Sequence, residues 1–183
     1  MSEQAVFLKG SLLRHITVMS LTSTVGLMAV FLVDFVDMIF IAMLGKAELA
    51  AAIGYAGAIL FFTSSFGIGM AIAAGALVAR ALGEGDEELA RAKATNALIY
   101  GVAFGIVFAA LVWMNLAFLA GLMGATGETL TLAVSYLQII IPSLPFLLVG
   151  IVGGAILRAH GDARRAMMAT VMGGIVNAIL DPI

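Results

Sequence analysis

The chain has 183 residues, of which 63% are hydrophobic and 11% are charged, and its mean hydropathy is +1.16. Soluble domains carry about 25% charged residues, so this composition indicates an integral membrane protein. The formal net charge is only −2, and we expect no nucleic-acid partner. The absence of cysteine excludes disulfides, thiolate nucleophiles and cysteine-ligated metal sites.

Five apolar stretches, separated by charged or glycine-rich interruptions, are each long enough to cross a bilayer as a helix. They lie near residues 15–44, 51–80, 95–122, 130–157 and 166–183. Transmembrane strands would alternate polar and apolar residues over about ten positions, and the sequence lacks that alternation. The sequence therefore predicts an all-α integral membrane protein with five transmembrane helices.

The basic residues predict the orientation of these helices. All of them except Lys46 lie in the N-terminal segment or in and beside the loops at 81–94 and 158–165. Because basic loops favour the cytoplasmic side, we expect a cytoplasmic N-terminus and cytoplasmic placement of both loops. Acids precede bases across residues 83–95, the order expected of a short interfacial helix that complements its dipole. A solvated connector is a more usual role for such a charged loop than a regulatory site. The first apolar stretch is too long for a signal peptide, so we expect it to be retained.

Three carboxylates lie inside the predicted spans: Asp34, Asp37 and Asp181. A carboxylate at the bilayer centre costs about 2.5–3.5 kcal/mol on insertion scales, so it usually faces a bundle interior or an aqueous cavity. No lysine or arginine lies deep in a predicted span, so these acids must bind a proton or a cation, or face water. Asp34 and Asp37 share one helix face, and Asn177 and Asp181 share another. The pattern predicts a site for H⁺ or Na⁺ between the first and fifth helices, with no cofactor and no other metal.

Each of these residues also has a structural interpretation. Asp37 or Asp181 could cap a kink, and Asn177 alone is typical of a hydrogen bond between helices. For Asp34, a structural role beside the site and a role in the site explain the sequence equally well, because the sequence does not fix its depth in the membrane.

The fourth span carries further polar groups and two prolines, Pro142 and Pro145, which predict a bend that frees backbone carbonyls. Tyr136 lies near the outer end of this span, where an interfacial position and a site role are both consistent with the sequence. The two histidines, His15 and His160, fall at cytoplasmic ends, which favours interfacial placement over a proton relay. Glycine and alanine recur across 67–79, which predicts a close helix contact.

Three stretches together resemble the first half of multidrug and toxic compound extrusion (MATE) transporters. They are FVDMIFIAMLGKAELAAAIG (35–54), GALVARALGEGD (75–86) and LRAHGDARRAMMATVMGGIVNAILDPI (157–183). The last is the most specific, because it joins a basic loop to an Asn-x-x-x-Asp-Pro helix. The resemblance implies a twelve-helix fold in two six-helix lobes. It also implies a plasma-membrane antiporter that exports organic cations and amphipathic drugs in exchange for H⁺ or Na⁺.

The resemblance implies a cation site at Asp37, Asn177, Asp181 and Tyr136, and Asp34 is an additional acid outside the usual motif. Residues 1–183 would then be an incomplete N-terminal lobe, truncated in or after its fifth helix, whose partners are the lipid bilayer, the drug and the missing C-terminal lobe.

Two other functions remain open from the sequence. A related flippase for lipid-linked oligosaccharides would need basic residues in its cavity to bind phosphates, and none is visible. A non-transporting membrane scaffold or gene fragment would show no ion-dependent drug binding. An enzyme is not expected, because the spans contain no nucleophile–base pair and no metal-ligand cluster.

Overall fold

The computed structural model describes residues 11–43 and 45–180, the last four of these by their backbone only. The described residues form helices joined by short turns, which confirms the all-α prediction for this part of the chain. In order, they are α1 (Leu12–Met43), α2 (Ala47–Gly83), α3 (Glu87–Met114), α4 (Leu116–Leu122), α5 (Gly127–Ile140), the 3₁₀ turn η2 (Ile141–Ser143), α6 (Leu144–Ala159) and α7 (Ala163–Leu180).

Among the described residues, four helical segments are long and apolar enough to cross a membrane: α1, α2, α3 and the α5–α6 unit. α7 coincides with most of the fifth predicted span, and its role as a fifth transmembrane helix stays a prediction. The cytoplasmic location of the N-terminus also stays a prediction.

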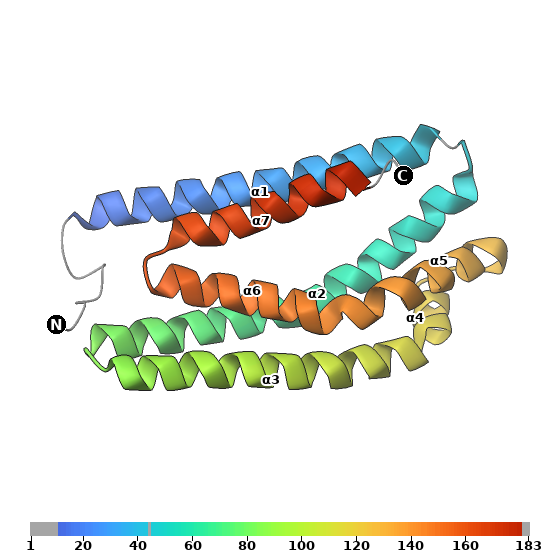
Figure 1. Cartoon of the computed structure of the whole chain (residues 1–183). Coiled ribbons are helices and arrows are strands. Elements are labelled where there is room, and N and C mark those ends of the chain that lie inside the picture. Colours follow the sequence, from blue (N-terminus) through green and yellow to red (C-terminus); the bar gives the residue numbers. More distant parts are fainter. Residues whose placement is uncertain (1–10, 44, 181–183) are drawn as a thin grey trace.

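The helices form two groups (Figure 1). α1 lies along α7, whereas α2, α3 and α6 pack against one another, and α6 also contacts α7. Small residues allow α1 and α7 to approach closely: a Cβ atom added to Gly26 would lie 3.9 Å from Thr170 Cβ, and one added to Gly174 would lie 3.4 Å from Val33 Cγ2. From the first contact to the second, the residue number rises on both helices, so α1 and α7 are parallel.

Glycines also bring α2, α3 and α6 close together. A Cβ atom on Gly105 of α3 would lie 2.9 Å from the backbone Cα of Pro145 and 2.9 Å from Leu148 Cδ1. On α2, a Cβ atom on Gly67 would clash with Leu148, and one on Gly75 would contact Ala155. The close contact predicted for residues 67–79 is therefore present, and α6 is its partner.

The third predicted span, 95–122, differs from the structure at both ends. α3 begins at Glu87, within the predicted loop, because Asp86 Oδ1 accepts the Leu89 N–H at 2.8 Å and so caps the helix. At the far end Asn115 separates α3 from the short α4, and its Nδ2 donates to the Leu111 carbonyl at 2.8 Å. A side-chain amide that bonds to the nearby backbone competes with the regular helix. The third predicted span is therefore two helices, α3 and α4.

The prolines of the fourth span bend it as predicted. Pro142 has no N–H, so the Gln138 carbonyl lacks its usual partner one turn ahead. Trp113 of α3 supplies the missing donor, with its Nε1 3.2 Å from the Gln138 oxygen. The Ser143 hydroxyl donates to the Ile140 carbonyl at 2.8 Å. The bend between α5 and α6 therefore keeps its backbone hydrogen-bonded inside the membrane, where no water is available.

Candidate cation site

A cavity of about 810 Å³ lies between α1, α2 and α5. Of the residues that the structure describes, the charged ones in its lining are Asp34 and Asp37 of α1, and Tyr136 of α5 borders it as well. Residues that are far apart in the sequence thus border one space. Acidic and phenolic oxygens in a mostly apolar cavity can bind a proton or a cation.

The two carboxylates differ in their surroundings. They are three residues apart on α1, so they lie on the same helix face. Asp34 is exposed, whereas Asp37 is half-buried and its Oδ1 is shielded from solvent. Charge on a buried carboxylate is costly unless a proton, a cation or hydrogen bonds compensate it. Asp37 is therefore the one of the two whose charge is partly removed from solvent.

Tyr136 borders the cavity because of how α5 is oriented. The adjacent Leu137 is fully buried in a core cluster with residues of α2 and α3, which fixes the rotation of α5 about its axis. The bend at Pro142 lets α5 lean against α2 while α6 continues along α2 and α3. Tyr136 is consequently a wall residue, 40% exposed, rather than a core residue.

The remaining predicted site residues belong to the end of the chain. Asn177 is part of α7, but its side chain lies outside the described residues, and Asp181 lies outside them entirely. The backbone still shows how far along α7 position 177 lies relative to α1. Gly174 of α7 lies next to Val33 of the parallel helix α1. Positions 177 and 37 each lie about one helical turn beyond this contact, so they are at a similar height along the two helices.

Sequence reasoning missed the apolar and aromatic walls of the cavity. From α2 these are Ile53, Gly57, Leu60, Phe61 and Ser64, and from α1 they include Val30, Met38, Phe40 and Ile41. The α2 residues recur at intervals of three and four, the spacing that marks one face of a helix. That spacing is the signal in the sequence, but it cannot distinguish a cavity wall from a face that packs on another helix.

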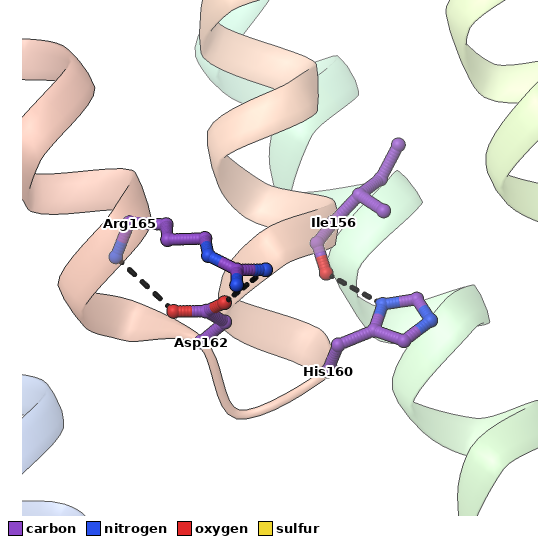
Figure 2. Close-up of polar contacts among 4 residues, drawn as sticks. All are labelled: Ile156, His160, Asp162 and Arg165. Atoms are coloured by element: carbon purple, nitrogen blue, oxygen red, sulfur yellow. Dashed lines mark hydrogen bonds and ion pairs between the residues drawn. The ribbon is translucent and has the colours of Figure 1, made fainter.

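The turn between α6 and α7 is polar but does not border this cavity (Figure 2). Asp162 Oδ1 accepts the Arg165 N–H at 3.2 Å, and Asp162 Oδ2 lies 3.1 Å from Arg165 Nη1. His160 Nδ1 lies 3.0 Å from the Ile156 carbonyl oxygen of its own helix. These contacts stabilise the turn and the start of α7.

Within the part of the chain that the structure describes, no group of three or more His, Cys, Asp or Glu side chains is arranged to hold a metal ion. The oxygens of the cavity are few, and a proton or a monovalent cation needs fewer charged ligands than Ca²⁺ does.

Comparison with known proteins adds an independent line of evidence. The MatE family model matches residues 23–183. An FAD transporter of Shewanella oneidensis is 30% identical over 165 residues, which cover 90% of this chain and 36% of that protein. The multidrug export protein MepA of Staphylococcus aureus is 26% identical over 167 residues, which cover 90% of this chain and 36% of MepA.

The fold matches a solved structure along its full length. An outward-facing multidrug resistance MATE family transporter of the MOP superfamily superposes with a TM-score of 0.93 at 28% identity. The match covers 100% of this chain and 40% of that one. The chain therefore spans little more than a third of the length of the curated relatives that it matches.

Proposed function

Because this chain belongs to the MatE family of multi-pass plasma-membrane transporters, we propose that it provides the cation-coupling site of a secondary antiporter. The antiporter would export organic cations and amphipathic drugs and take up H⁺ or Na⁺ in return. The complete transporter would include a further lobe, since the relatives are longer. The family is one of transporters and not of enzymes, and no cofactor is part of the proposal.

The observation that carries this proposal is the sign of the charge in the cavity. Among the described residues, both charged side chains that line it, Asp34 and Asp37, are acidic. Carboxylates at membrane depth are costly and are retained mainly where they bind ions or protons. A cavity with this lining favours cationic ligands over anionic ones.

We assign the coupling ion to Asp37, Tyr136, Asn177 and Asp181, with Asp34 as an accessory acid. The contact of Gly174 with Val33 supports the inclusion of Asn177, because it brings the turn of α7 that contains position 177 beside the turn of α1 that contains Asp37. Amide, phenol and carboxylate oxygens are ligands for Na⁺, and the same carboxylates can bind H⁺ instead.

Aromatic walls support an organic cation as the exported substrate. Phe40, Phe61 and Tyr136 line the cavity together with the acids. An aromatic face attracts a cation, and the attraction strengthens where water is excluded. Ligand pockets in proteins typically have volumes of about 300–1,000 Å³, and about 810 Å³ lies within this range.

Coupling would follow from the shared carboxylates. If H⁺ or Na⁺ and the drug both interact with Asp37, binding of one lowers the affinity for the other by the same factor. An inward ion gradient would then favour release of the drug on the outer side.

The decisive experiment measures ethidium efflux from proteoliposomes that contain the full-length transporter, driven by a proton or a sodium gradient. Asp37→Asn should abolish the dependence on the gradient, and Asp34→Asn should reduce it only in part. Glu128→Gln, at the exposed start of α5, is a matched control that should leave efflux unchanged. Normal gradient-driven efflux by the Asp37→Asn variant would overturn the assignment, and absence of any ion-dependent ethidium binding would favour a scaffold.

The similarity to an FAD transporter raises a second substrate, a flavin nucleotide. FAD carries two phosphates, which would require basic groups, and the described residues that line the cavity include none. The same reasoning disfavours a lipid-linked oligosaccharide. FAD efflux that exceeds ethidium efflux in the same vesicles would favour the flavin nucleotide.

A further inference from the structure

Arg158, near the end of α6, has an unusual position for a loop-flanking arginine. Its guanidinium folds back over its own helix at Gly154, where an added Cβ would lie 3.4 Å from Nη1 and 3.8 Å from Nη2. The side chain is half-buried, although it is one residue from the end of the helix. Glycine at position 154 leaves the room in which the guanidinium lies.

The charge of Arg158 is not neutralised within the described part of the chain. Arg80 pairs with Glu84 at 2.9 Å, and Arg165 pairs with Asp162 at 3.1 Å. Among the described residues, the Arg158 guanidinium has neither a carboxylate within 4.0 Å nor a hydrogen-bond acceptor. A half-buried guanidinium is therefore available to an anion from outside the described structure.

Arg158 borders two cavities, of which the smaller carries hydroxyl groups and the larger is almost entirely apolar. The smaller, about 260 Å³, lies between α1 and the first turns of α7, and its polar lining includes Thr22, Ser23 and Thr170. The larger is a groove of about 520 Å³ between α1, α2 and α6, with apolar walls that include Ile72 and Ala76. A cationic group thus lies where a small pocket with three hydroxyl groups meets an apolar groove.

Two of the three hydroxyls that line the smaller pocket, those of Thr22 and Thr170, do not replace the guanidinium as donors. Thr22 Oγ1 donates to the Val18 carbonyl at 2.8 Å, and Thr170 Oγ1 donates to the Ala166 carbonyl at 3.2 Å. Their protons are already used by their own helices. An anion at this place would consequently be bound by Arg158, with Ser23 as the remaining hydroxyl donor of the pocket.

We propose that Arg158 and the adjoining groove bind an anionic phospholipid of the cytoplasmic leaflet. The planar guanidinium can bind two phosphate oxygens at once, and the apolar groove can accept an acyl chain. The negative surface of the cytoplasmic leaflet supplies such lipids, and the basic loops predict that this end of α6 faces it. The site is separate from the acidic cavity, since twelve residues of α1, about 18 Å at helical rise, separate Thr22 from Asp34.

Native mass spectrometry of the full-length transporter in micelles with equal amounts of phosphatidylglycerol and phosphatidylcholine tests the proposal without any transport readout. The wild type should retain phosphatidylglycerol preferentially. Arg158→Gln should lower the ratio of bound phosphatidylglycerol to phosphatidylcholine about tenfold. Arg164→Gln, an exposed arginine of the same turn, is the matched control and should change the ratio by less than about twofold.

Two further variants keep the test decisive. Arg158→Lys replaces Arg158→Gln if the latter does not fold. It keeps the charge but loses the planar pair of donors, so we expect a ratio between those of the wild type and a neutral variant. Ala76→Phe should fill the exposed side of the groove and reduce retention of both lipids. Equal ratios for wild type and Arg158→Gln would overturn the proposal. A cysteine introduced at position 76 tests whether the groove is open to lipid. Failure of a lipid-soluble maleimide to label this cysteine would also overturn the proposal, because another part of the transporter would then cover the groove.

Discussion

The indole Nε1 of Trp113 lies 3.2 Å from the carbonyl oxygen of Gln138 and donates the hydrogen bond that Pro142 cannot make. This bond joins α3 to the bend between α5 and α6. It allows the fourth span to bend without an unpaired carbonyl at membrane depth, and the bend in turn brings Tyr136 to the cavity that Asp34 and Asp37 line.

Substituting Trp113 with Phe removes this donor and keeps an aromatic ring. We expect the free energy of unfolding to fall by about 1–2 kcal/mol, since a carbonyl in apolar surroundings loses its partner. The measurement is reversible unfolding by SDS in mixed micelles.

The double-mutant cycle with Pro142→Ala isolates this bond. That second substitution restores a backbone N–H at position 142, which can bond to Gln138 directly. Trp113→Phe should then cost less than about 0.5 kcal/mol, so an equal cost in both backgrounds would contradict the role assigned to the indole.

The approach of α3 to α6 depends on Gly105. An added methyl would lie 2.9 Å from the backbone of Pro145, which cannot move as a flexible side chain can. We expect Gly105→Ala to reduce the free energy of unfolding by about 1–3 kcal/mol through overpacking.

Gly69→Ala on α2 is the control for this prediction, because a Cβ atom at that position has no heavy atom within 4 Å. It should leave stability unchanged or raise it slightly through helix propensity. Thermal unfolding in detergent compares the two, and similar losses in both variants would show that close packing at Gly105 is not the cause.

Phe61 should contribute to organic-cation affinity because it lines the acidic cavity. Phe61→Ala is expected to weaken ethidium binding about 2- to 30-fold, the range that corresponds to one cation–π contact. Fluorescence titration of ethidium gives the dissociation constants.

The neighbouring Phe62 provides the comparison. It is absent from the cavity lining and packs edge-on against Phe66, with ring centroids 5.4 Å apart. Phe62→Ala should leave the dissociation constant of ethidium unchanged. Equal weakening by both substitutions would indicate a general effect on α2 instead of a contact in the cavity.

Asp162 should stabilise the start of α7 mainly as a cap. Its Oδ1 accepts the Arg165 N–H, whereas its ion pair involves a guanidinium side chain that is 79% exposed and therefore contributes little. Asp162→Ala is expected to cost about 1 kcal/mol of unfolding free energy, and Asp162→Asn, which retains an acceptor, should cost less than half of that. SDS unfolding distinguishes the two, and equal losses would assign the stabilisation to the ion pair.

Several features followed from residues close together in the sequence. The apolar stretches predicted membrane helices, Pro142 and Pro145 predicted the bend in the fourth span, and family membership was recognisable from three short stretches. Local capping was harder to predict. The bonds made by Asp86 and Asn115 changed the bounds of the third span, because single side chains compete with a long apolar pattern.

The residues alone were enough to identify a membrane protein and the carboxylates that must bind a proton or a cation or face water, because transfer between water and lipid is a property of each residue and its near neighbours. Tertiary structure decided which faces meet. α1 is apolar around most of its surface, so its hydrophobic pattern does not indicate which side faces lipid, α7 or a cavity. The packing of α1 on α7, and of the bent α5 on α2, brought Asp34, Asp37 and Tyr136 to one space, although Asp34 and Tyr136 are about 100 positions apart in the sequence.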